Sequence, residues 1–284
     1  MSSAPDALRT RLGVLIRDRV VGDDAEAKRA ALFDAPGERW FVDDAAIREV
    51  HADAAMFVGG LRALLLQSLH PLAMAGVAQH SDYRADPWGR LQRTADFLAA
   101  TTFGPVEVAE HAVARVREVH RRVRGRAADG RPYSAGDPHL LRWVHVCEVD
   151  SFLAAHQRYG AAPLSPARAD EYVAQTAVVA ERLGVNHPPV TVAELAREIT
   201  DFRPELGSTP EARAAARFLL VEPPLPLPAR PAYGLLAAAA VGLLPAWTRW
   251  PLRLPWLPVS ERLLVRPAGA AVTGVIRWSL AAAG

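Results

Sequence analysis

Apolar positions recur along most of the chain at spacings of three and four, which is typical of helices with one buried face. Pro5 to Arg19 shows this pattern, and its proline is placed to open a first turn. The pattern predicts further helices over residues 43–54, 165–184, 190–202, 209–221, 233–248 and 259–280. No convincing pair of alternating segments indicates a sheet, and no internal repeat is present. We therefore expect an all-α fold of about ten helices.

The longest apolar segment runs from Met56 to His80 and contains very few charges. A helix that is apolar all round is expected to be buried on every side. The His70-Pro71 dipeptide interrupts the segment, because proline removes a backbone donor and restricts the residue before it. The pattern therefore predicts a buried helix with a kink or break at this point.

Three helices in the middle of the chain are expected to begin at proline and end at glycine, as capped helices do. They run from Asp86-Pro87 to Gly104, from Pro105 to Gly125 and from Asp137-Pro138 to Gly160. The stretch "AADGRPYSAGDP" between the last two is expected to be a connector.

The C-terminal third contains a proline-rich linker, Glu222 to Pro231, and then an apolar segment from Tyr233 to Trp247. That segment is shorter than the roughly 20 residues that span a bilayer, and Pro245 interrupts it. The basic, tryptophan-rich "TRWPLRLPW" behind it is compatible with a membrane interface. We favour the alternative, a core helix followed by a packed, proline-rich strap.

Length, composition and charge are those of a folded protein with a sizeable core. The chain has 284 residues, half of them apolar, and a formal net charge of +2. This length can bury a sizeable core, so we expect one all-helical domain over residues 1–284, with its core motifs in 56–160 and C-terminal helices and strap in 222–284. Lys28 is the only lysine. The near balance of charge does not indicate nucleic-acid binding.

Cys147 is the only cysteine, which excludes an internal disulfide and a CxxC zinc site. The first thirty residues lack the apolar core and cleavage site of a secretory signal, so a cytoplasmic location is expected.

Several familiar sites are missing from the sequence. It contains no phosphate-binding loop, dinucleotide-binding glycine motif, HExxH or GxSxG. A di-iron bundle needs Glu-x-x-His pairs, and only the reverse order, His145 and Glu148, is present. These absences disfavour nucleotide hydrolysis, zinc hydrolysis and di-iron oxygenation.

His120 lies on the apolar stripe of the expected helix after Pro105. Ala109, Val113, Val116, His120 and Val123 follow each other at spacings of four and three. A neutral imidazole in a core must satisfy both ring nitrogens, one of which can bind a metal. The spacing alone leaves two alternatives: a hydrogen-bonded core histidine, which is the default, or a metal ligand.

The preceding helix carries Arg90, Arg93 and Thr94 on one side, next to an apolar stripe of Leu91, Ala95 and Leu98. Guanidinium and hydroxyl groups beside an apolar surface suit an anion or the polar end of a large apolar ligand. Spacing alone slightly favours an ordinary solvated edge.

The remaining histidines are weaker candidates. His70 is expected to hydrogen-bond across the helix break, and His80 to cap a turn. His145 and His156 share a helix with Cys147, which we interpret as a small core residue.

The order of these motifs resembles the MpaB and latex-clearing-protein oxygenase family. The resemblance rests on "GGLRALLLQSLHPLAMAGVAQHSDYRADPWGRLQRTADFL", "VREVHRRVRG" and "GRPYSAGDPHLLRWVHVCEVDSFLAAHQRYG", and it covers about residues 40 to 280. It implies an all-helical fold with a globin-like core and a buried b-type haem.

The resemblance also implies roles for individual residues. The family's R-x-x-H pair falls on Arg117 and His120, which makes His120 the proximal iron ligand and places Arg117 and Arg90 at the cofactor. Its R-x-x-K-T block falls on Arg90, Arg93 and Thr94 at the distal or propionate side. Arg93 replaces the family's lysine and cannot ligate iron comparably. The helices at 56–79 and 138–159 would sandwich the macrocycle.

The expected function is therefore a haem-b oxygenase that uses O₂ or peroxide on a small to medium apolar substrate, with a redox donor as a further partner. The departure at Arg93 weakens the case for rubber as that substrate. A haem oxidase or dehydrogenase, or a non-catalytic haem- or lipid-binding protein, are the alternatives. Nucleic acid is not expected as a partner, and peripheral membrane contact is not favoured.

Overall fold

The computed structural model describes residues 4–22 and 25–281, and helices dominate them. The α-helices are α1 (Ala4–Val21), α2 (Ala25–Arg29), α3 (Ala46–Ala52), α4 (Met56–Gln67), α5 (Pro71–His80), α6 (Pro87–Phe103), α7 (Val106–Arg122), α8 (Pro138–Tyr159), α9 (Pro166–Leu183), α10 (Val192–Phe202), α11 (Pro210–Val221), α12 (Arg230–Leu243), α13 (Ala246–Arg249), α14 (Pro258–Ser260) and α15 (Arg266–Leu280). Short 3₁₀ or π turns are η1 (Ala30–Asp34), η2 (Arg203–Glu205), η3 (Leu227–Ala229) and η4 (Glu261–Val265). The all-α prediction is confirmed.

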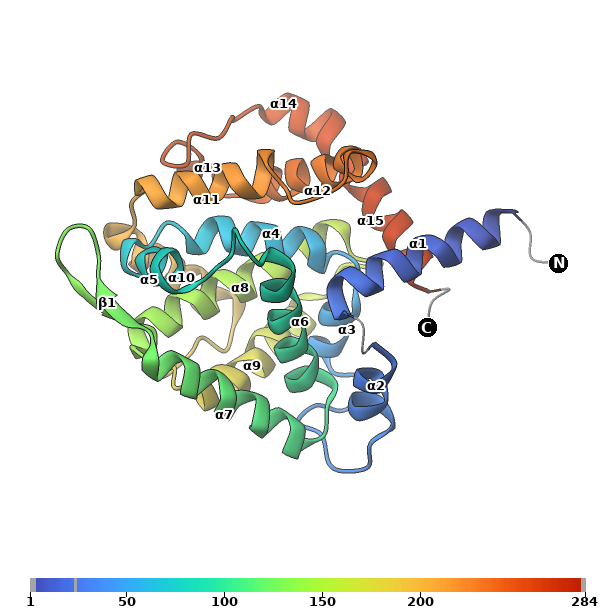
Figure 1. Ribbon diagram of the computed structural model, residues 1–284, viewed down its shortest axis with the longest axis horizontal. Coiled ribbons are helices and arrows are strands. Elements are labelled where there is room, and N and C mark those ends of the chain that lie inside the picture. The colour runs from blue at the N-terminus through green and yellow to red at the C-terminus, as the bar shows by residue number, and fades with distance from the viewer. Residues whose placement is uncertain (1–3, 23–24, 282–284) are drawn as a thin grey trace.

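The helices α4 and α8 form the centre of the molecule. Figure 1 shows the C-terminal helices α11 to α15 on one side of this pair, and α7 and α9 on the other. The pair is held closely, because the indole N–H of Trp143 donates to the carbonyl of Gln67 at 3.1 Å and the Gln67 side chain donates to the carbonyl of Val144 at 3.3 Å. Gly59 allows the close approach, since a Cβ at this position would lie 2.7 Å from the ring of Phe152.

A buried charge ties the central pair to the C-terminal layer. The guanidinium of Arg62 on α4 lies 2.7 Å from Asp150 and 2.6 Å from the hydroxyl of Ser151, both on α8. It also donates to the carbonyl of Leu243 at the end of α12. A buried charge is tolerated only when it is paired in this way, so three helices depend on one side chain.

The break between α4 and α5 occurs where it was predicted. The chain bends by 107° between the two helices. His70 lies between them and caps α5, because its Nδ1 accepts the backbone N–H of Leu72 at 3.3 Å. Within the described residues no one helix has both the length and the apolar composition to cross a membrane, although the bent α4–α5 pair passes the same test when taken together.

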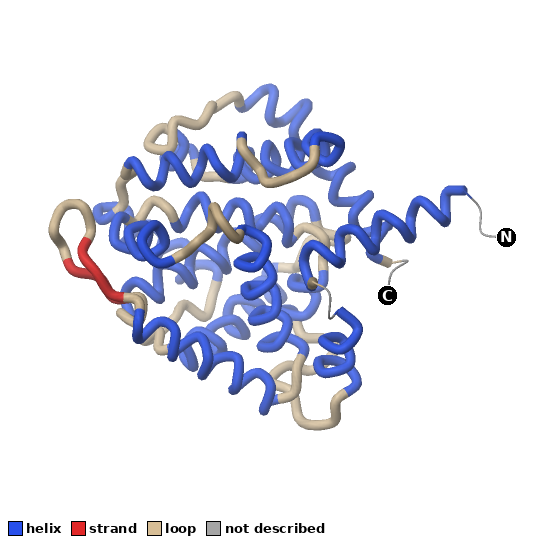
Figure 2. The backbone as a smooth tube through the Cα atoms, viewed as in Figure 1, coloured by secondary structure: helices blue, strands red, loops and turns tan. Residues whose placement is uncertain are grey.

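The predicted helix starts and stops agree closely with the structure, and the caps explain why. Asp86 accepts the N–H of Gly89 and Asp137 accepts that of His139, each just ahead of a proline in the first turn. The sequence did not predict α2 and η1, nor the hairpin of β1 (Arg124–Arg126) and β2 (Pro132–Ser134), visible as the two red segments in Figure 2, which ends α7 at Arg122 and not at Gly125. Strands of three residues are too short to show alternation.

The proline-rich strap that follows α13 is not packed as we expected. Leu252 is buried, but Trp250 and Trp256 on either side of it are exposed. Pro245 divides the predicted helix 233–248 into α12 and α13. The expectation of a fully packed strap is therefore wrong at the two tryptophans.

Candidate active site

Five helices, α3 and α6 to α9, enclose a narrow cavity of about 90 Å³. Most of its walls are apolar. Its apolar lining consists of Ile47, Phe97, Leu98, Leu141, Val144, Val149, Phe152, Val179, Ala180, Leu183 and Val185. A volume of this size has room for a few water molecules, and a larger ligand requires the helices to separate.

His120 points from α7 into this cavity. Its Nδ1 is buried and has no hydrogen-bond partner among the described residues. Burial lowers the pKa of the imidazole, because the charged form loses its hydration. The ring is therefore neutral and has a free nitrogen in an apolar environment. The predicted stripe is correct in orientation, since Ala109 and Val113 ahead of it are buried.

Two titratable groups on α8 face the same cavity, His145 and Glu148. Their spacing of three places them on one face of the helix, together with Phe152 one turn further on. Burial lowers the pKa of His145 to about 4 and raises that of Glu148 to about 7. The Nε2 of His145 has no partner in the described part of the chain.

His51 enters the cavity from α3 and is anchored by two hydroxyl groups. Its Nδ1 lies 2.8 Å from the hydroxyl of Thr102, and its Nε2 lies 3.4 Å from that of Tyr172. The rings of Phe152 and Tyr172 pack edge-on against it. Burial lowers its pKa to about 3, so this imidazole is neutral and fixed in place.

The cavity therefore brings together three neutral imidazoles and one carboxyl group within apolar walls. A free imidazole nitrogen binds a metal or a proton. A carboxyl group with a pKa near 7 can give or take a proton at neutral pH. Such perturbed groups in an enclosed space are typical of catalytic sites.

The residues predicted from α6 lie beyond this cavity. Arg93 is exposed and pairs with Asp86 at 3.2 Å. Arg90 is half-buried and donates to the hydroxyl of Ser81, while the hydroxyl of Thr94 donates to the carbonyl of Arg90. Thr94 shares the α6 face of the cavity residues Phe97 and Leu98, one turn away from them. The geometry does not bring Arg90, Arg93 or Thr94 to His120.

Arg117 also lies outside the cavity. Its exposed guanidinium donates to the backbone carbonyl of Arg182 on α9 at 3.2 Å. Arg182 in turn pairs with Glu110 on α7 at 3.1 Å, so these contacts fasten the outer side of α7 to α9. The expected sandwich by residues 56–79 is not formed, because α4 packs against α8 and does not line the cavity.

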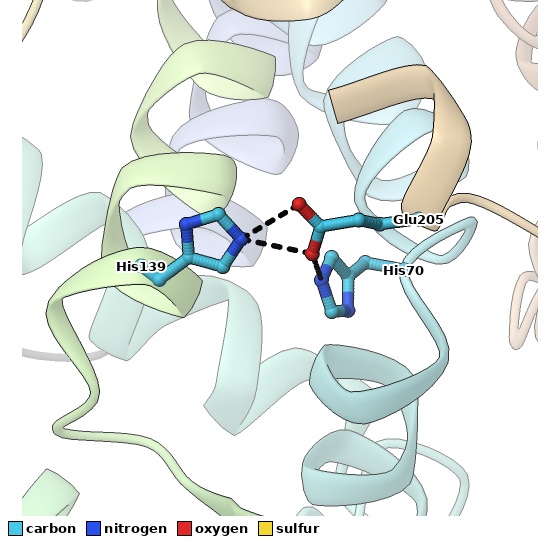
Figure 3. Close-up of side chains that lie close together, drawn as sticks. All are labelled: His70, His139 and Glu205. Carbon is cyan, nitrogen blue, oxygen red and sulfur yellow. Dashed lines mark hydrogen bonds and ion pairs between the residues drawn. The ribbon is translucent and has the colours of Figure 1, made fainter. Parts of the chain in front are cut away.

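A second cluster lies where the starts of α5 and α8 meet η2. Figure 3 shows the imidazoles of His70 and His139 facing the carboxylate of Glu205. The Nε2 of His139 lies 2.9 Å from a Glu205 oxygen and the buried Nε2 of His70 lies 3.6 Å from it. Two imidazoles and a carboxylate are a ligand set that can hold a divalent ion, and their ligand atoms lie within 4.8 Å of one another.

The tautomer of His70 argues against a bound metal in this arrangement. Its Nδ1 accepts a hydrogen bond from Leu72, so the neutral ring carries its proton on Nε2, the atom that faces Glu205. A metal on Nε2 would move that proton to Nδ1 and break the cap of α5. We therefore interpret the cluster as a helix cap joined to a His139–Glu205 pair.

Sequence reasoning identified His120 and missed three other residues of the cavity. From the sequence, His145 is a weak candidate, Glu148 is only part of a motif in reverse order, and His51 is not considered. The sequence does contain a pattern for the α8 residues, because Leu141, His145, Glu148 and Phe152 are spaced along one helical face. His51 gives no comparable signal, since only the packing of α3 against α9 brings it to the cavity.

The fold and the cavity define an all-α protein with an enclosed, histidine-lined site of the kind that catalysis uses. A family model described as the catalytic domain of the ER-bound oxygenase mpaB/B′ and rubber oxygenase matches residues 48–278. The chain belongs to this family, and its matched region is an oxygenase-type catalytic domain. The comparisons with curated proteins and with solved structures gave no match.

Proposed function

We propose that the protein is a haem-b-dependent oxygenase that uses O₂ or peroxide on a small to medium apolar organic substrate. In this proposal His120 is the proximal iron ligand. The observation that carries it is the buried, unpartnered Nδ1 of His120 in the apolar cavity of a member of an oxygenase family. The apolar lining and the small volume support a substrate without charge.

The donor set of the cavity suits a haem. Haem iron takes a neutral imidazole as an axial ligand, and the macrocycle needs apolar walls on both faces. His120 supplies the imidazole, and Phe97, Leu98 and Leu141 are among the apolar residues around it. The cavity of about 90 Å³ is too narrow for a macrocycle, so binding requires α7 to move away from the helices behind it.

The bound haem would supply activation of O₂ or peroxide, and the chain's own groups would control protons and water. Glu148 can hold a proton on its carboxyl group at neutral pH or release it to a neighbour, because its pKa is raised to about 7. His145 stays neutral at this pH, because burial lowers its pKa to about 4, so the proton remains on Glu148 until a reacting group takes it. The apolar walls exclude bulk water from these groups.

The family resemblance supports a place for Arg90, Arg93 and Thr94 at the distal or propionate side. Thr94 continues the α6 face that lines the cavity, so separation of α6 and α7 would bring it nearer to a ligand. Arg93 would have to leave Asp86. This part of the proposal depends on that movement.

The test is an absorption spectrum of protein purified from haem-replete cells, beside the variants His120→Ala and His111→Ala. His111 is the matched control, because it is exposed on the same helix. We expect a Soret band in the wild type and in His111→Ala, and its loss or a shift of several nanometres in His120→Ala.

Two outcomes would contradict different parts of the proposal. No Soret band in the wild type rejects haem. A band that His120→Ala leaves unchanged rejects His120 as ligand. Oxygen consumption with apolar test substrates then separates an oxygenase from a haem protein without turnover.

A further inference from the structure

The C-terminal layer has an unusually apolar outer surface. Six large apolar side chains between Trp250 and Leu264 are more than half exposed: Trp250 88%, Trp256 63%, Leu257 56%, Val259 69%, Leu263 65% and Leu264 69%. We call these six residues the C-terminal apolar surface. Single exposed apolar residues are common, but six within fifteen residues of chain are typical of an interaction surface.

These residues belong to one continuous piece of chain at the edge of the molecule. They follow from the end of α13 through α14 into η4. Figure 1 shows α14 at the outermost edge of the C-terminal layer, beyond α12 and away from α7 and α9. The surface lies apart from the cavity, whose lining includes no residue after Val185. Whatever covers it does not contact the proposed site.

The charges around this surface are positive. After Glu222 the sequence contains six arginines and a single acidic residue, Glu261. Glu261 is occupied by an ion pair with Arg249, and Arg277 pairs with Asp53. The exposed Arg253, Arg262 and Arg266 have no carboxylate partner in residues 4–22 and 25–281. Unpaired arginines therefore flank the apolar side chains.

We infer that the C-terminal apolar surface docks on an anionic lipid bilayer without crossing it. Tryptophan is enriched at the membrane interface, where its ring is apolar and its N–H remains hydrated. Arginine heads can pair with lipid phosphates while their stems lie along the apolar groups. These six residues lie on short helices and turns, so we place them at the bilayer surface.

Charge favours lipid over a second copy of this chain as the occupant. Two copies meeting through the same surface would bring Arg253, Arg262 and Arg266 of each next to those of the other. Like charges at such an interface oppose association. An anionic bilayer instead attracts them, and each arginine near it raises the partition coefficient about fivefold.

Co-sedimentation of the full-length, as-purified protein with vesicles tests the inference. The probes are vesicles of phosphatidylcholine alone and of phosphatidylcholine with phosphatidylserine, at low and high salt. We expect binding to the anionic vesicles, a blue shift of tryptophan fluorescence and a loss of binding at high salt. Trp250→Ser with Trp256→Ser should reduce binding at least tenfold, and Arg253→Gln with Arg262→Gln by about twentyfold.

A matched control removes similar groups elsewhere on the surface. Val42→Ser with Arg124→Gln deletes an exposed apolar side chain and an exposed arginine outside the C-terminal layer, and binding should remain. Failure of the wild type to bind anionic vesicles overturns the inference. It is also overturned if the control variant loses as much vesicle binding as the tryptophan and arginine variants do. Light scattering that shows a dimer abolished by the tryptophan variants would assign the surface to self-association instead. Thermal melts of all variants exclude unfolding as the cause.

Discussion

At the scale of single residues, two histidines of the cavity are buried at a ring nitrogen without a partner in the described chain. His120 and His145 each hold a buried ring nitrogen that no described residue satisfies. A buried polar group in this state costs free energy, roughly 1–3 kcal/mol, unless water or a ligand satisfies it. His120 and His145 differ from His70 and His156, which also have an unpartnered buried nitrogen in the described structure, because they share an apolar cavity with Glu148.

Burial of Glu148 should make the stability of the haem-free protein depend on pH. Burial raises its pKa from 4.5 to about 7, so the folded state keeps a proton that the unfolded state releases between these pH values. The free energy of unfolding should therefore fall as pH rises through this window. Glu148→Gln removes the effect, and we expect it to stabilise the protein at pH 8 by roughly 2–3 kcal/mol and by almost nothing at pH 4.

Urea unfolding from pH 4 to pH 8 measures this difference, with Glu181→Gln as the control. Glu181 is an exposed carboxylate on α9, and its substitution should change stability by less than about 0.5 kcal/mol at any pH. A Glu148→Gln variant that is less stable than the wild type at pH 8 would contradict the assignment of an uncompensated, buried carboxyl group.

At the scale of helices, one glycine decides how closely α4 and α8 pack. A Cβ on Gly59 would lie 2.7 Å from the Phe152 ring and 3.1 Å from its Cα, whereas Gly60 has no atom within 4 Å of such a Cβ. Gly59→Ala should therefore lower the free energy of unfolding by roughly 1–3 kcal/mol through overpacking. Chemical denaturation of the purified variant measures it.

Gly60→Ala is the control on the same helix. With open space around it, this substitution should raise stability by about 0.5–1 kcal/mol, because alanine is the better helix former. The opposite signs at neighbouring positions make the pair informative. Equal effects at both positions would show that the spacing of α4 and α8 does not depend on Gly59.

The helices themselves were predictable, because proline, glycine and capping side chains carry the information locally. Asp86 and Asp137 fix the starts of α6 and α8 by hydrogen bonds within three residues. The cavity was not predictable in the same way. It depends on which faces of α3, α8 and α9 meet, and only the stripe through His120 showed its orientation in the sequence.

At the scale of the whole molecule, one buried carboxylate links the C-terminal helix to the N-terminal half, in addition to the packing of α15 against α1. Asp53, after α3, accepts the guanidinium of Arg277 on α15 at 2.8 and 3.0 Å, and the backbone N–H groups of Ala55 and Ala161 at 2.7 and 3.1 Å. Burial alone would raise the pKa of Asp53, but these bonds outweigh it and hold the pKa below its usual 3.8.

Asp53→Asn should therefore destabilise the protein by roughly 2–3 kcal/mol at pH 7, since Arg277 loses its partner. The wild type gains this stability above pH 3.8 and loses it as pH falls below that value, so the difference should shrink in acid. Thermal melts at pH 7 and pH 3.5 test this. Asp43→Asn is the control, because Asp43 is 94% exposed and its pair with Arg48 should contribute little.

The outer wall of the cavity has a consequence for how a ligand comes and goes. On that side α7 is fastened to α9 by exposed contacts, the Arg182–Glu110 pair and the bond from Arg117. Dissolved ions screen exposed charges over about 8 Å at physiological ionic strength. We therefore expect opening of this wall to become easier as salt rises. A ligand bound in the cavity should then dissociate faster at high ionic strength than at low ionic strength.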